Sequence, residues 1–244
     1  MDRHSQGRAI AGLPLLSIKQ IGDAPPEPLS AAARPLAGIR VLDLTRIIAG
    51  PVCGRTLAAH GADVLLVGAS HLPSLRPLVI DTGRGKMSTF IDLREASGRE
   101  TLAALIRDAD VFVQGYRPGA IAALGFGPDE VAKLRPGIIY VSLSAYGHEG
   151  PWAARRGFDS LVQTATGFNI AEAEAFGASE PRPLPAQALD HGTGHLLAFA
   201  AMAALARRAE QGGSWHVRAS LAQTGCWLRA LGRINGLADR KSVV

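Results

Sequence analysis

The fold is decided by one stretch of sequence, LAGIRVLDLTRIIAGP, which occupies residues 36–51. This stretch contains the segment IRVLDL at residues 39–44, in which four of the six residues are apolar, and this segment predicts a short buried strand. The second half of the stretch ends in Gly50-Pro51. Proline is well tolerated in the first turn of a helix, where the N–H that it lacks would have no partner. A strand that leads directly into a helix predicts the beginning of a layered α/β domain.

The same alternation continues along the chain. Further strands are predicted at residues 63–67, 88–93, 110–113, 138–143 and 215–221. Helices are predicted at residues 50–61, 98–108, 128–134, 158–167 and 193–209, with another that ends near residue 232. Strands of four to six residues between helices predict an α/β fold. We expect a Rossmann-like, open and mainly parallel sheet with flanking helices.

The two ends of the chain differ from this pattern. The proline- and alanine-rich residues 24–35 indicate an extended segment, so residues 1–35 are predicted to be a linker or the tail of a preceding domain. The predicted domain covers residues 36–238. Residues 239–244, DRKSVV, correspond to the translation of a common sequencing adapter, and we expect them to be an artefact of a gene that was cut off.

Composition excludes several classes of protein. A hydrophobic fraction of 47% is enough for a core, which excludes disorder for most of the chain. The longest apolar run, residues 196–206, is too short to span a membrane. The formal charge of +5 suits nucleic acid or a small polyanion, but no basic stripe interleaved with aromatic residues is present, so we expect no nucleic-acid partner. Two cysteines cannot build a disulfide framework, which favours the cytoplasm.

A glycine-rich segment at residues 82–87, TGRGKM, resembles a phosphate loop only in part. A Walker A loop needs glycine where this chain has Ile80, and serine or threonine where it has Met87. Arg84 and Lys86 remain candidates for contacts with phosphate oxygens. A solvated turn before a strand explains them equally well.

Other catalytic signatures are missing from the sequence. Cys53 and Cys226 are far apart, and His191 with His195 has no third ligand nearby, so we expect no metal site. There is also no G-x-S-x-G motif of a serine hydrolase.

Asp190 is the most informative acidic residue, in the segment LDHGTGH that precedes the predicted helix 193–209. One interpretation is a helix N-cap, a position that aspartate often occupies. The other is a catalytic carboxylate at a helix N-terminus, beside glycines that allow a substrate to approach. Asp159 is placed similarly at a predicted helix start. Asp43, inside the first strand, is more typical of a structural acid.

A series of short motifs follows the opening stretch in order. These are GADV (61–64), GRGKMS (83–88), IDL (91–93), ADV (109–111), YRPG (116–119), LG (124–125), PGIIY (136–140), YGHEGP (146–151), GFD (157–159), Asp190 and GGSWHV (212–217). Together they resemble the family III CoA-transferases, which include formyl-CoA transferase, carnitine CoA-transferase and α-methylacyl-CoA racemase. The resemblance covers residues 36–232. It implies the N-terminal part of that family's large domain.

The resemblance also implies a reaction. In family transferases the aspartate at the position of Asp190 attacks an acyl-CoA thioester and becomes an aspartyl-CoA thioester, from which a carboxylic acid takes over the CoA. Coenzyme A or acyl-CoA is then a substrate, and no metal is involved. The residues implied to bind CoA are Ile48, Ala49, Gly50, Pro51, Arg84, Lys86, Gly115, Tyr116 and Arg117.

Departures from the family pattern leave two alternatives. One is a racemase or isomerase, which is disfavoured because the racemase branch has histidine where this chain has Phe158. The other is a CoA-binding module without turnover, suggested by Gly68 and Ala123, where many members have an acidic residue and an arginine. Family members continue through a second domain and form interlocked homodimers. We therefore expect exposed apolar surface on residues 196–206 or near Trp227.

Overall fold

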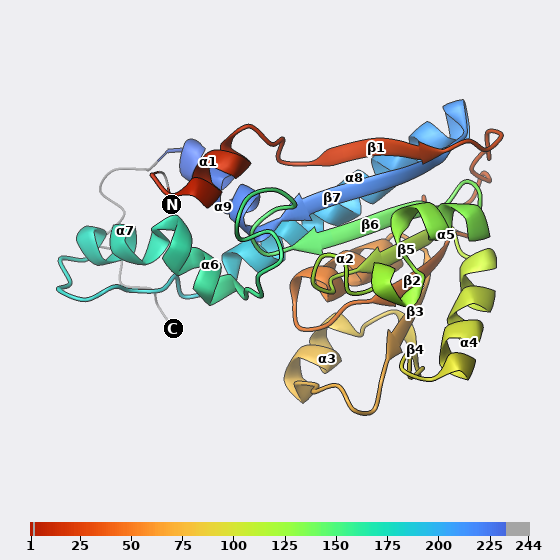
Figure 1. The fold of residues 1–244 in the computed structure, drawn as a ribbon, viewed down its shortest axis with the longest axis horizontal. Helices are drawn as coiled ribbons and strands as arrows, with labels where there is room; N and C mark the ends of the chain where they lie inside the picture. Colours follow the sequence, from red (N-terminus) through yellow and green to blue (C-terminus); the bar gives the residue numbers. More distant parts are fainter. Residues whose placement is uncertain (2, 233–244) are drawn as a thin grey trace.

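The structure is a computed structural model that describes residue 1 and residues 3–232 of the 244. Its described residues form a seven-stranded sheet with the order β1-β7-β6-β5-β2-β3-β4 (Figure 1). The strands are β1 (Ser17–Gly22), β2 (Arg40–Leu44), β3 (Asp63–Gly68), β4 (Lys86–Phe90), β5 (Val111–Gln114), β6 (Ile139–Ser144) and β7 (Ser214–Ser220). Neighbouring strands from β7 to β4 are parallel, and β1 pairs antiparallel with β7. The predicted fold class is confirmed.

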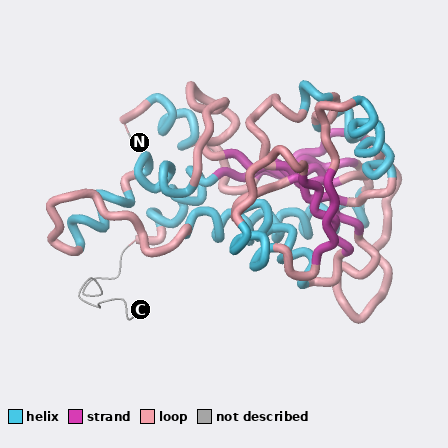
Figure 2. The backbone as a smooth tube through the Cα atoms, turned by 90° about the horizontal axis from the view of Figure 1, so that it is seen from below, coloured by secondary structure: helices cyan, strands magenta, loops and turns pink. Residues whose placement is uncertain are grey.

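Helices lie on both sides of this sheet (Figure 2). They are α1 (Ser5–Ala11), α2 (Ala49–Ala59), α3 (Arg76–Thr82), α4 (Ala96–Arg107), α5 (Pro128–Leu134), α6 (Asp159–Thr166), α7 (Phe168–Ala175), α8 (Ala188–Gln211) and α9 (Leu221–Ala230), with a 3₁₀ turn at Ala122–Leu124. One apolar cluster joins α2 and α8 to the sheet, and a second joins α4 and α5 to it. A third cluster joins α1, α6 and α9 at one end of the molecule (Figure 1). In the described part of the chain, no helix has the length and apolar character of a membrane span.

The N-terminal segment differs from the extended linker predicted over residues 1–35. Helix α1 packs through Ile10 in the third cluster, and β1 adds an antiparallel strand beside β7. Its sequence SIKQIG has no long apolar run, because an edge strand is only half buried. Residues 23–32 form neither helix nor strand, as expected. The division of the chain at residue 35 stays a prediction, and the proposed artefact at 239–244 lies outside the described residues.

Helices α2 and α8 approach closely because one glycine leaves room between them. A Cβ atom on Gly194 would lie 2.5 Å from the Ala49 carbonyl oxygen and 2.8 Å from the Val52 side chain. Such contacts are far inside van der Waals distance, so no larger residue fits here without moving a helix. This packing places the second turn of α8 beside the first turn of α2, the helix that follows β2.

Candidate active site

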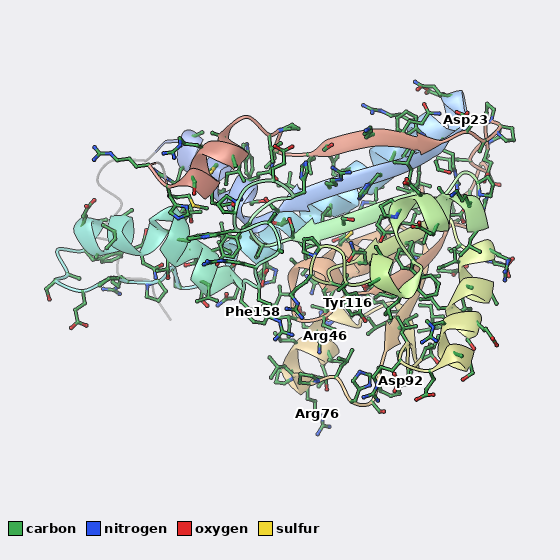
Figure 3. All side chains as sticks on the ribbon, viewed as in Figure 1. Asp23, Arg46, Arg76, Asp92, Tyr116 and Phe158 are labelled. Atoms are coloured by element: carbon green, nitrogen blue, oxygen red, sulfur yellow. The ribbon has the colours of Figure 1, made fainter. Side chains whose placement is uncertain are left out.

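A cavity of about 500 Å³ opens at the carboxyl ends of the parallel strands, where ligands bind in open α/β sheets. Its walls come from the segments that follow β2, β5 and β6, from the segment before α6, and from Asp190 on α8. Figure 3 shows three of its residues, Arg46, Tyr116 and Phe158, near one another. Segments distant in sequence therefore meet in one pocket.

Asp190 lies in the first turn of α8 and is 7% exposed. The N-cap interpretation is wrong, because α8 begins at Ala188 and its N-cap is Gln187. Burial raises the pKa of the Asp190 carboxyl to about 7, and the nearby Asp159 adds to this rise. A carboxylate that lines a pocket and is poorly solvated is typical of a catalytic group.

Asp159 fixes the backbone at Asp190. Its Oδ2 accepts a hydrogen bond of 2.7 Å from the Asp190 N–H, and its Oδ1 accepts one from the side-chain amide of Gln163. That amide also donates to the Ala186 carbonyl at 3.0 Å, and Gln163 Oε1 accepts from the Leu184 N–H at 3.0 Å. The first residue of α6 therefore holds the segment that enters α8. Asp159 is 1% exposed and does not line the pocket.

The raised pKa of Asp190 predicts how stability depends on pH. Between pH 4 and 7 the folded chain binds a proton that the unfolded chain, with a pKa of 3.8, has released, so the free energy of unfolding falls as pH rises. The asparagine side chain of the Asp190→Asn variant cannot ionise, so this fall in the free energy of unfolding does not occur in the variant. We expect the variant to be more stable than the wild type by about 4 kcal/mol at pH 8 and nearly equal to it at pH 4.

Urea unfolding of both proteins at the two pH values measures this difference. Asp129→Asn, at an exposed position on α5, is the matched control and should show little change at either pH. A stability difference for Asp190→Asn that does not depend on pH would contradict the prediction.

Four arginines line the same pocket: Arg46, Arg117, Arg155 and Arg156. All four are exposed, and none has a carboxylate within ion-pair distance among the described residues. Arg46 donates to the Pro73 carbonyl at 3.2 Å, and Arg155 stacks on Trp152 at 5.2 Å. Unneutralised guanidinium groups at a pocket favour an anionic ligand. Arg46, Arg155 and Arg156 were not predicted as site residues. For Arg155 and Arg156, the available signal in the sequence is that they are adjacent and precede the GFD motif.

Several residues implied to bind CoA line the same pocket as Asp190. The pocket is lined by Ile48, Ala49, Gly115, Tyr116 and Arg117. Gly50 and Pro51 follow in the first turn of α2 but do not line it.

The turn into α2 has an unusual backbone. Ile47, which lines the pocket, has φ 74°, a value that β-branched residues rarely adopt. Such strain clusters at functional sites, and nothing in the local sequence reveals it.

Lys86 does not line this pocket, and its expected contact with phosphate stays a prediction. Its Nζ donates to Asp43 Oδ2 at 2.7 Å and to the Pro51 carbonyl at 2.8 Å. The two side chains are 1% and 0% exposed, so the ammonium has no surface left for a ligand. Arg84 is exposed beside Asp81 and borders a separate hollow of about 310 Å³. Neither residue lies with Asp190.

Metal-binding side chains do not gather anywhere in the described residues: no group of three or more histidine, cysteine, aspartate or glutamate side chains could hold an ion.

Comparisons with known proteins bear on this pocket. Residues 36–240 match the model of CoA-transferase family III. The acetyl-coenzyme A transferase nodX of Hypoxylon pulicicidum is 40% identical over 207 residues, which are 83% of this chain and 35% of that protein. The succinate–glutarate CoA-transferase of Agrobacterium fabrum is 31% identical over 205 residues, 77% of this chain and 51% of that protein.

A solved structure agrees with the sequence matches. The crystal structure of Rv3272 from Mycobacterium tuberculosis has a TM-score of 0.75 and 34% identity, and the match covers 82% of this chain and 56% of that one. The chain thus spans between about a third and somewhat over half of these relatives' length. The matched fold, the ordered motifs and the family model agree, and the chain belongs to CoA-transferase family III.

Proposed function

We propose that the chain provides the CoA pocket and the nucleophile of an enzyme that moves CoA from an acyl-CoA to a carboxylic acid. The observation on which this rests is the pairing of one buried carboxylate, Asp190, with four unpaired arginines around a single cavity. Coenzyme A has a diphosphate and a further phosphate at one end and a reactive sulfur at the other. The arginines suit the phosphates, and Asp190 suits the thioester.

The proposed reaction begins at an oxygen of the Asp190 carboxylate. It attacks the thioester carbonyl, the C–S bond breaks, and a mixed anhydride and CoA thiolate result. The thiolate attacks the aspartyl carbonyl of the anhydride, which releases the original acid and leaves an aspartyl-CoA thioester. An acceptor carboxylate then repeats both steps in reverse, which forms the new acyl-CoA and frees Asp190.

The environment of Asp190 supports this role. A carboxylate is a weak nucleophile, and its reactivity increases with its basicity, so a pKa of about 7 makes the ionised form more reactive than an ordinary aspartate. The first turn of α8 adds a positive helix end that stabilises charge on the attacked carbonyl oxygen. The bond from Asp159 holds the backbone at this position.

A racemase is less well supported. Racemisation needs acid and base groups on the two sides of a substrate carbon. Among the described pocket residues, Asp190 is the sole carboxylate and there is no histidine. The position before Asp159 is Phe158, which lines the pocket and has no proton to transfer.

The interlocked homodimer stays a prediction. Its expected apolar surface is present at Phe199 on α8, which is 60% exposed, and at Trp227 on α9, which is 39% exposed. A partner subunit would cover such side chains.

Binding of CoA tests the proposal. We expect calorimetry to detect CoA binding that weakens with added salt, and Arg117→Gln to raise the Kd roughly 10- to 100-fold through loss of a charged contact. Arg107→Gln, on the exposed side of α4, is the matched control and should leave the Kd unchanged. A chain that does not bind CoA at millimolar concentration, or equal effects of the two variants, would contradict the proposal.

A further inference from the structure

A row of polar side chains crosses three neighbouring strands at their carboxyl ends. Gln114 on β5, Ser142 on β6 and Arg218 on β7 are register partners and therefore share one face of the sheet. Gln114 Nε2 donates to Ser142 Oγ at 3.0 Å, and His216 Nε2 lies 2.8 Å from the same oxygen. Arg218 Nε donates to His216 Nδ1 at 3.3 Å. We call these four residues the cross-sheet row.

The protons in the row have one consistent arrangement. Because Arg218 donates to His216 Nδ1, the imidazole is neutral and its proton lies on Nε2, which then donates to Ser142 Oγ. Burial and the charge of Arg218 lower the pKa of His216 to about 3, which agrees with a neutral ring. Ser142 Oγ therefore accepts hydrogen bonds from both His216 and Gln114. Because Gln114 uses its Nε2 for this bond, its Oε1 is the atom that faces away from the row.

Gln114 Oε1 is the atom of the row that contacts the loop beside the pocket. It accepts a hydrogen bond of 2.9 Å from the Tyr116 N–H. Tyr116 lines the pocket together with Gly115 and Arg117. The Tyr116 side chain packs against the second apolar cluster, but Pro118 has no N–H and the Arg117 carbonyl accepts from Ala120 within the same turn. Gln114 thus provides the side-chain hydrogen bond that fixes the loop backbone at Tyr116.

We propose that Gln114, Ser142 and His216 are positioning residues that hold the loop at residues 115–117 in its ligand-receiving conformation. They touch no ligand themselves, because they act through the Tyr116 backbone. Ordering the loop before binding removes an entropic cost from the encounter with a ligand. The identity of that ligand as CoA rests on the proposed function, whereas the ordering of the loop does not.

Ser142→Ala tests the row at its centre. Hydrogen exchange at the Tyr116 amide should become about tenfold faster, and CoA should bind about tenfold more weakly. Ser142→Thr keeps the hydroxyl and should restore both. Gln114→Met, which removes the link to Tyr116 but leaves His216 and Ser142 paired, should give the same two effects and serves if Ser142→Ala does not fold.

Ser214→Ala is the matched control. Ser214 lies at the opposite end of β7, is fully buried, and accepts a hydrogen bond of 2.8 Å from the Gly137 N–H. Loss of this hydrogen bond should lower the free energy of unfolding without changing hydrogen exchange at the Tyr116 amide.

The two measurements separate the two hypotheses. Unchanged Tyr116 exchange in Ser142→Ala and Gln114→Met, or equal acceleration in Ser214→Ala, overturns the positioning role. A wild-type chain that does not bind CoA overturns the proposed function, and exchange at Tyr116 then still decides whether the row orders the loop.

Discussion

Asp190→Ala is expected to abolish the attachment of CoA to the protein and to slow exchange of labelled CoA into acyl-CoA by at least about 10³-fold. The reason is chemical: without a carboxylate at this position no anhydride or aspartyl thioester can form. Mass spectrometry of peptides after incubation with acyl-CoA should find CoA attached at Asp190 in the wild type and none in the variant. Binding of CoA should persist, because the arginines of the pocket are unchanged.

Two further variants test whether the effect is specific to the carboxylate of Asp190. Asp190→Asn keeps the shape of the side chain and should also fail to form the adduct, which separates nucleophilicity from packing. Asp129→Asn, an exposed acid on α5, should behave as wild type. A CoA adduct on another residue, or exchange that survives both Asp190 variants, would remove Asp190 from the mechanism.

Lys86→Met is expected to lower the free energy of unfolding by about 3–5 kcal/mol. The substitution leaves Asp43, which is fully buried, without its cation. Asp43 Oδ1 also accepts from the Thr45 N–H and hydroxyl, so the carboxylate cannot turn out to solvent. A Cβ on Gly54 would lie 2.4 Å from Asp43 Oδ2, so the pair is enclosed directly against α2. Chemical denaturation measures the loss.

The control is Lys133→Met, at an exposed position on α5, which should change stability by less than about 0.5 kcal/mol. The double variant Lys86→Met with Asp43→Leu should recover part of the loss, because it removes both buried charges but leaves the two Thr45 donors unpaired. A Lys86→Met protein with normal stability but weakened CoA binding would instead restore the phosphate contact that the sequence suggested.

The central strands β2, β5 and β6 were predictable because they are mostly buried and rich in apolar residues, whereas β4, at the exposed edge of the sheet, begins and ends before the predicted range 88–93. Sequence reasoning missed β1, since an edge strand such as SIKQIG alternates too weakly to stand out. It also missed the short helices α3 and α7. Boundaries that depend on distant contacts were shifted: the start of α8 adjoins the side chain of Asp159, 31 residues earlier, and no local pattern around Asp190 records this.

The site was predictable to a similar degree. The motifs placed Asp190 and the loop at residues 115–117 in one site, because the order of the motifs resembles a known family. The ion pair of Lys86 was not predictable, since its partner, Asp43, lies 43 residues away on another strand. The place of the arginines at positions 155 and 156 was not predictable, because only the folded chain brings them to the pocket.

The pairing of β1 with β7 also affects how this protein avoids aggregation. An open strand edge is a template on which strands of other molecules can add. The sheet meets solvent on this side at a short strand whose exposed centre is Lys19-Gln20, and a lysine on an edge strand opposes such addition. The residues that provide this protection precede the segment matched by the family model. Strand β7, which the family model includes, is thus covered by an edge strand that lies outside that model.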